Sequence, residues 1–116
     1  MSFDISENWF FDATPNTAND IPAGATDFIT VAAHELGHIL GFTNVNARNH
    51  WISGGSFTGP TASSIYGGPV PMQGSHIAAG AGNHLMNASY TFGTRKLPTS
   101  LDRAILDDIG YTVIYS

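Results

Sequence analysis

The amino-acid sequence predicts a single small domain of the α+β class. Two stretches, residues 27–41 and 99–109, carry capping residues and apolar side chains at spacings of three and four, as amphipathic helices do. Residues 9–11 and 111–115 have the aromatic and β-branched composition of short strands. Between the helices, residues 44–83 are rich in glycine, proline, serine and asparagine, so we expect a long irregular segment there. A chain of 116 residues suits one modest hydrophobic core.

The N-terminal part is expected to lead from a strand at Trp9-Phe10-Phe11, through a turn-rich loop, into the first helix. Thr26 or Asp27 can cap this helix, and Asp27 also suits the positive end of the helix dipole. Gly41 is a natural stop. The apolar residues that predict one buried face of the helix are Phe28, Val31, Ala32, Leu36 and Ile39. The second helix is expected to be capped by Thr99 or Ser100 and ended by Gly110.

The first helix contains the segment His34-Glu35-Leu36-Gly37-His38. Positions i and i+4 share one helical face, so the two imidazoles can bind one ion together. Neutral imidazoles favour zinc, and Glu35 is offset so that its carboxylate lies beside the ion rather than on it. A carboxylate placed in this way is typical of a hydrolytic general base. The alternative, a core helix with two incidental histidines, must accommodate a glutamate in an apolar segment, where unpaired charge is costly.

Composition excludes several functional classes. The formal net charge is −5 with only 4 Lys and Arg residues, which argues against a nucleic-acid partner. No apolar run reaches the length of a membrane span. The absence of cysteine leaves His, Asp and Glu as metal ligands. The low lysine content and the many Gly, Ser, Thr, Asn and Ala residues favour a secreted or extracellular protein. Because the residues after Met1 do not resemble a signal peptide, we expect the chain to be part of a longer precursor, with a cytoplasmic protein as the alternative. The sequence sets no oligomeric state.

The helix and its surroundings resemble the metzincin clan of zinc endopeptidases. In that clan a glycine corresponding to Gly41 turns the chain beneath the metal, and a third histidine usually follows three residues later, where this chain has Asn44. Leishmanolysin-like metzincins instead carry a long insertion and place the third histidine about ten residues before the methionine of the Met-turn. Here Gly74-Ser75-His76-Ile77 precedes Leu85-Met86-Asn87 by that spacing.

The resemblance implies a metzincin-like (zincin) catalytic domain and a set of site residues. Residues 1–26 would be a remnant of an N-terminal sheet, 27–41 the zinc helix, 42–84 the insertion, and 85–116 the Met-turn and C-terminal helix. His34, His38 and His76 would bind Zn²⁺, and Glu35 would be the catalytic base. The implied activity is hydrolysis of peptide bonds in a protein or peptide substrate.

Several alternatives remain open at this point. His84, His50 or Asn44 could take the place of His76 as the third ligand. With so few residues before the zinc helix, the chain could be a catalytically incomplete zinc-containing fragment or binding domain. It could also be a zinc hydrolase that acts on an ester or amide other than a peptide.

Overall fold

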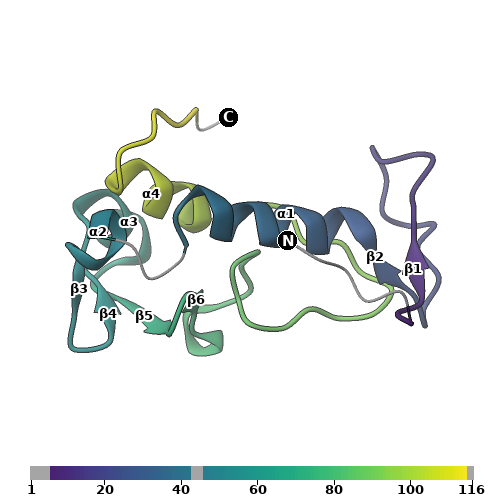
Figure 1. Ribbon diagram of the computed structural model, residues 1–116, viewed down its shortest axis with the longest axis horizontal. Helices are drawn as coiled ribbons and strands as arrows, with labels where there is room; N and C mark the ends of the chain where they lie inside the picture. The colour runs from purple at the N-terminus through teal and green to yellow at the C-terminus, as the bar shows by residue number, and fades with distance from the viewer. Residues whose placement is uncertain (1–5, 43–45, 115–116) are drawn as a thin grey trace.

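A computed structural model describes residues 6–42 and 46–114 and confirms the α+β class. The small parallel sheet β1–β2 lies at one end of α1, and a four-stranded sheet with α2 and α3 lies at the other (Figure 1). In chain order the elements are β1 (Trp9–Phe10), β2 (Thr26–Asp27), α1 (Phe28–Leu40), α2 (Asn46–Asn49), β3 (Ile52–Ser53), β4 (Ser56–Phe57), α3 (Pro60–Tyr66), β5 (Val70–Gln73), β6 (His76–Ile77), the 3-10 helix η1 (Ala79–Ala81) and α4 (Ser100–Asp108).

Both predicted ends of α1 are confirmed. The side chain of Asp27 accepts hydrogen bonds from the backbone N–H and the hydroxyl of Thr30, at 3.1 and 2.7 Å, so Asp27 rather than Thr26 is the N-cap. Gly41 ends the helix with φ of 146°, a backbone conformation that residues with a Cβ rarely adopt. An added Cβ there would also overlap the side chain of Ile109.

The predicted buried face of α1 is wrong in its second half. Leu36 is 49% exposed and Ile39 is 63% exposed, whereas the buried residues of the helix are Thr30, Val31 and Gly37. Leu36 lines an apolar cavity of about 210 Å³ between α1 and α4. Hydrophobic spacing identifies an apolar face but carries no information on what covers it, and here α4 covers that face incompletely.

The prediction that residues 44–83 are irregular is also wrong. The described part of this segment contains α3 and an antiparallel sheet in the order β3-β4-β5-β6. The strands have two to four residues and are too short to show a two-residue alternation. Glycines with positive φ occupy the tight turns, namely Gly54 and Gly55 between β3 and β4 and Gly74 between β5 and β6. The same glycines made the segment resemble a loop.

α4 matches its prediction and also supports α3. Thr99 and Asp102 form a capping box at its start, and Gly110 follows its last turn. At its end, the carboxylate of Asp108 accepts from the backbone N–H groups of Thr61 and Ala62 at 2.9 and 2.8 Å. Asp108 thereby caps α3, which has no capping side chain of its own.

The strand predicted at 111–115 is absent over residues 111–114, and Tyr115 lies outside the described residues. Tyr111 is 44% exposed and Ile114 is 80% exposed. Strand-forming composition needs a neighbouring strand and a covered face, and the structure offers this run neither. The strand predicted near Trp9 is present as β1, which pairs with β2. The rings of Trp9 and Phe11 both pack against Phe28 at the start of α1.

Arg95 joins the N-terminal segment to the start of α1. Its buried guanidinium forms ion pairs with Asp27 at 2.9 Å and with Asp12 at 2.6 Å. It also donates to the carbonyl oxygens of Pro15 and Thr17 at 2.7 and 2.9 Å. Burial by itself would raise the pKa of Asp27, but the hydrogen bonds from Arg95 and Thr30 hold that pKa below its ordinary value of 3.8.

The lowered pKa of Asp27 predicts a specific dependence of stability on pH. Arg95→Met should lower the free energy of unfolding by about 2 kcal/mol at pH 7, because it leaves a buried carboxylate without its charged partner. The Asp27 contribution is fully present above its unfolded pKa of 3.8 and is lost as pH falls through the lower folded pKa. Urea unfolding between pH 2 and 7 should therefore show the two proteins converging at acid pH. The difference between Asp27→Asn and an Asp27→Asn/Arg95→Met double variant should converge less at acid pH, because only Asp12 then pairs with Arg95. A pH-independent difference for Arg95→Met would contradict the assignment.

Candidate metal centre

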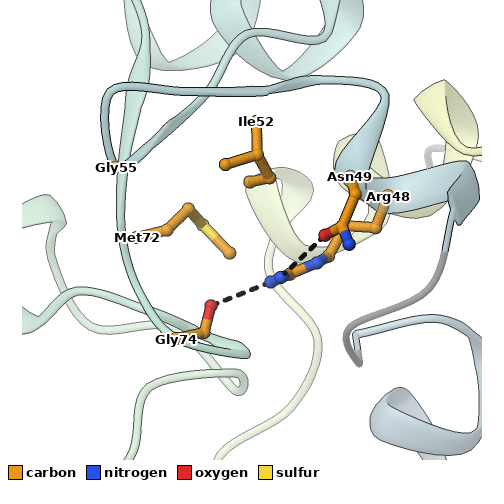
Figure 2. A pocket seen from close by; sticks show the side chains of 6 residues that line it. All are labelled: Arg48, Asn49, Ile52, Gly55, Met72 and Gly74. Atoms are coloured by element: carbon orange, nitrogen blue, oxygen red, sulfur yellow. Dashed lines mark hydrogen bonds between the residues drawn. The ribbon is translucent and has the colours of Figure 1, made fainter.

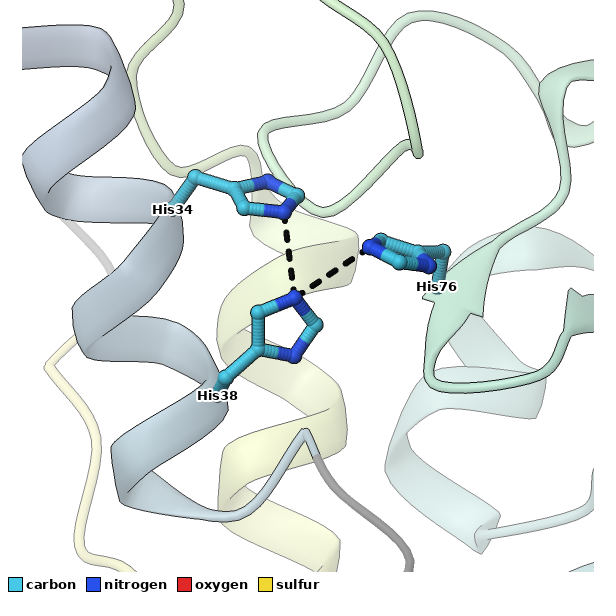
Figure 3. A group of neighbouring side chains, drawn as sticks. All are labelled: His34, His38 and His76. Atoms are coloured by element: carbon cyan, nitrogen blue, oxygen red, sulfur yellow. Dashed lines mark hydrogen bonds between the residues drawn. The ribbon is translucent and has the colours of Figure 1, made fainter. Parts of the chain in front are cut away.

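Three histidines from two elements converge on one point (Figure 3). His34 and His38 lie one turn apart on α1, and His76 comes from β6. The Nε2 atom of His38 lies 3.1 Å from that of His34 and 3.2 Å from that of His76. The potential ligand atoms of all three residues lie within 4.8 Å of one another, close enough to bind one metal ion. The structure thus brings together the three residues that the sequence analysis selected.

The outer nitrogens of two of these rings are held by backbone carbonyl groups. Nδ1 of His34 lies 2.8 Å from the carbonyl oxygen of Leu85, and Nδ1 of His38 bonds the carbonyl oxygen of Phe42. A carbonyl oxygen only accepts, so each Nδ1 must carry the hydrogen. Each Nε2 therefore presents a lone pair to the centre of the cluster. This is the tautomer in which metal-binding histidines are usually held.

The inward lone pairs make the cluster suitable for a cation. Lone pairs on the Nε2 atoms of His34 and His38 repel each other at 3.1 Å unless a positive charge lies between them. Nitrogens bound tetrahedrally to zinc at about 2.0–2.1 Å lie roughly 3.3 Å apart, close to this separation. Burial lowers the pKa of His76, and the neighbouring His38 and His34 lower it further, which keeps the ring neutral and able to bind a metal.

The turn at Leu85–Asn87 holds both parts of the cluster in place. Its first carbonyl oxygen orients His34, as described above. The backbone N–H of Ile77, next to His76, donates to the carbonyl oxygen of Met86 at 2.8 Å. The side-chain amide of Asn87 donates to the carbonyl oxygen of Ile77 at 3.0 Å. One three-residue turn therefore fixes the orientation of the α1 histidine and the position of β6.

Met86 packs directly beneath the helix that carries His34 and His38. It is 1% exposed, and its sulfur lies against Gly37, where an added Cβ would overlap it. Gly37 is therefore required for close contact between α1 and the turn, a role that the sequence did not reveal. Met86 therefore packs against the backbone of α1 between His34 and His38 and is not itself in the ligand cluster.

Asp102 supports the turn from α4 and is a further functional residue that sequence reasoning missed. Its carboxylate accepts from the backbone N–H groups of Leu85 and Met86 at 2.9 and 3.0 Å and from that of Thr99 at 2.8 Å. The residue is 2% exposed. The sequence signal available was the capping pattern Thr99-x-x-Asp102, which predicts the contact with Thr99 but not those with the turn.

The competing third ligands lie elsewhere or outside the described residues. Both ring nitrogens of His84 have other partners, the hydroxyl of Thr99 at 2.6 Å and the carbonyl oxygen of Ala81 at 3.1 Å. The ring of His50 packs edge-on against Trp51. Asn44 falls in the segment 43–45, which the structure does not describe. Among the described residues, His76 is the one that completes the cluster.

Glu35 precedes the exposed Leu36 on α1 and is half-buried. Burial lowers the pKa of His76, and the negative charge of Glu35 raises it. The carboxylate of Glu35 is therefore close enough to the cluster to interact with it electrostatically. It is not among the residues that could share the ion with the histidines. Three potential ligands can bind a cation, and the adjacent carboxylate can accept and donate a proton beside it.

Comparison with protein-family models, with curated proteins and with solved structures gave no match. Within the described residues, no helix combines the length and apolar character needed to cross a membrane.

We expect His76→Ala to abolish stoichiometric metal binding, as His34→Ala and His38→Ala should, because two imidazoles alone hold zinc weakly. His84→Ala and His50→Ala are the matched controls, and both should retain the metal. Metal content after dialysis, measured by plasma mass spectrometry, distinguishes these outcomes. Loss of metal from the His84 or His50 variant, with retention by the His76 variant, would contradict the observed cluster.

Asp102→Asn should weaken metal binding without removing a ligand. An amide offers one acceptor oxygen, so at least one N–H of the turn would lose its partner, at a cost of about 1–3 kcal/mol in stability. Loss of such outer support typically lowers metal affinity about 10–100-fold. Competition with a chromogenic chelator measures the affinity, and Asp107→Asn on the same helix is the control. Equal affinities for wild type and Asp102→Asn would show that the turn does not depend on this carboxylate.

Proposed function

We propose that this protein is a zinc-dependent endopeptidase of the metzincin type. The observation that carries the proposal is the convergence of His34, His38 and His76 with Glu35 alongside them on α1. Three neutral imidazoles with a fourth position left for water form a typical catalytic zinc site, whereas structural zinc sites have four protein ligands. Among the described residues the cluster holds three.

Glu35 would act as the general base and then as the general acid. A bound zinc ion would lower the pKa of water and polarise a carbonyl group. Glu35 would accept a proton from the attacking water as the new C–O bond forms. It would then return that proton to the amine as the peptide C–N bond breaks, so that no net proton is consumed. The hydrogen bonds from His34 and His38 to backbone carbonyls would keep both rings oriented throughout.

The assignment to the metzincin type is supported by features around the cluster. Gly41 ends the zinc helix and lets the chain turn away beneath it. Met86 lies under that helix in a tight turn, ten residues after His76, at the place where a Met-turn would be. α4 follows and holds the turn through Asp102. These features occur in the order of the clan's pattern.

A second candidate is a metal-binding domain that does not cleave peptides. The observation in its favour is the small upstream sheet, in which β1 and β2 have two residues each. An extended substrate often binds by adding a strand to a sheet edge, and this edge offers few hydrogen-bonding groups. A retained Glu35 argues for the enzyme, because metal binding alone needs no base. The same site chemistry would also serve hydrolysis of a non-peptide amide or ester.

Glu35→Gln should retain zinc and lose peptide cleavage by at least about 10²-fold, since proton transfer contributes that much to such reactions. Wild-type cleavage of casein or a fluorogenic peptide library should also stop with chelator and return with added zinc. Glu7→Gln, a glutamate away from the cluster, is the control. Zinc-loaded wild-type protein that cleaves no peptide would favour the binding domain, and turnover of ester substrates alone would favour the other hydrolase.

A further inference from the structure

A second cavity lies near the hairpin that carries His76. It has a volume of about 400 Å³, within the range of about 300–1,000 Å³ typical of small-molecule sites. Figure 2 shows the guanidinium of Arg48, from α2, reaching across the cavity towards the β5–β6 turn. The other residues that line it are Asn49, Ile52, Gly55, Met72 and Gly74.

Arg48 is buried but only partly satisfied. It is 4% exposed, and it donates to the carbonyl oxygen of Gly74 at 2.9 Å and to the side-chain oxygen of Asn49 at 3.3 Å. A guanidinium has five N–H donors. Its Nε atom has no hydrogen-bond partner. Two donors are therefore paired, both with neutral oxygens, within the described part of the chain.

Arg48 also lacks a counter-ion within residues 6–42 and 46–114. Neither of the ion pairs formed by Arg95 involves Arg48. Burial lowers the pKa of Arg48, and no neighbouring carboxylate opposes that shift. A buried charge without a partner is costly, and a planar guanidinium is best satisfied by a carboxylate, which can accept two parallel hydrogen bonds. The cavity thus contains a cation that no carboxylate of residues 6–42 and 46–114 neutralises.

Part of the cavity wall beside this cation is apolar. Ile52 and Met72 contribute aliphatic and thioether surface. An inorganic anion would leave that surface exposed to water, whereas a carboxylate on an apolar body would cover it. Low dielectric at the wall also strengthens the ion pair that such a ligand would form.

The position of the cavity relates it to the metal cluster. Met72 pairs with Ile77, and Gln73 pairs with His76, across the β5–β6 hairpin. Gly74, which accepts the bond from Arg48, lies two residues before His76. An extended chain spans at most about 3.6 Å per residue, so the Cα atoms of Gly74 and His76 lie no more than roughly 7 Å apart. Because successive strand residues point to opposite faces, Met72 and His76 lie on opposite faces of the hairpin, and the hairpin separates a ligand in the cavity from one at the histidine cluster.

We propose that the Arg48 cavity binds a carboxylate carried on an apolar body, through the guanidinium and the apolar wall of Ile52 and Met72. In the peptidase proposed above, and resting on that proposal, this carboxylate belongs to the substrate, as an acidic side chain or as a free C-terminus. The cavity then selects substrates by charge at a place beyond the β5–β6 hairpin from the histidine cluster.

The test uses the full-length Glu35→Gln protein with zinc bound, so that binding is measured without turnover. N-acetyl-leucine, N-acetyl-leucinamide and inorganic phosphate are titrated while the ¹H–¹⁵N resonance of the Arg48 Nε–H group is followed by NMR. Arg48→Met identifies that resonance by its loss. We expect saturable shifts with N-acetyl-leucine, none with the uncharged amide, and weaker binding of phosphate. Equal response to phosphate and N-acetyl-leucine would overturn the apolar part of the site, and no response to N-acetyl-leucine would overturn the proposal.

A second measurement separates the charge from the fold. By calorimetry, Arg48→Met should weaken N-acetyl-leucine binding at least tenfold, whereas Arg103→Met, which removes a guanidinium from α4, should leave it unchanged. Arg48→Lys keeps the positive charge but loses the planar pair of N–H donors. We therefore expect an affinity for N-acetyl-leucine between those of the wild type and Arg48→Met. Unchanged affinity in a folded Arg48→Met or Arg48→Lys protein would overturn the site. Carboxylate bound only at the metal would produce this result.

Two peptides then identify the source of the carboxylate. One has an internal glutamate and an amidated C-terminus, and the other has no acidic side chain and a free C-terminus. A shift of the Arg48 Nε–H resonance with either peptide supports the substrate role and names the source. A shift with neither, when N-acetyl-leucine still binds, would overturn the substrate role. Binding of these probes without any cleavage by wild-type protein would instead reject the peptidase and leave the carboxylate site intact.

Discussion

The carboxylate of Asp102 is the interaction on which the rest of the site depends. It caps α4 through Thr99 and also accepts from two successive N–H groups of the Leu85–Met86 turn. A buried carboxylate that accepts several N–H bonds holds its donors in a narrow geometry, because leaving any of them unpaired costs free energy. The turn is therefore fixed relative to α4. Its outward carbonyl groups are in turn the acceptors for His34 and for the strand of His76.

The hydrogen bonds of the Leu85–Asn87 turn bring together histidines that lie far apart in the sequence. His38 and His76 are separated by 38 positions, and the intervening segment includes its own sheet and helix. A long intervening segment makes convergence entropically unfavourable unless other contacts fix its end. The hydrogen bonds of Ile77 with Met86 and Asn87 supply those contacts next to His76. His76 is thus positioned by contacts within the protein.

Contacts between residues close in the sequence could be predicted, whereas contacts between residues far apart in the sequence could not. The caps of α1 and α4 were readable because Asp27 and Thr99 act on residues three positions away. The pairing of His76 with the α1 histidines came from resemblance to a family pattern rather than from any local signal. The roles of Gly37, Asp102 and Asp108 were not readable, since each acts on a partner at least 16 positions away. Hydrophobic spacing likewise gave no sign that Leu36 faces an incompletely covered cavity.

The lone pairs at the centre of the cluster couple metal binding to the placement of the hairpin. Two inward Nε2 atoms at 3.1 Å repel each other, and the third is brought within 3.2 Å by β6 alone. A cation bound there would convert this repulsion into attraction for all three rings and would add to the contacts that hold β6. The carbonyl groups that fix the Nδ1 hydrogens oppose rotation of the α1 rings away from one another. The Leu85–Asn87 turn therefore holds α1 and β6 together by itself, and a bound ion would strengthen the arrangement that the turn already sets.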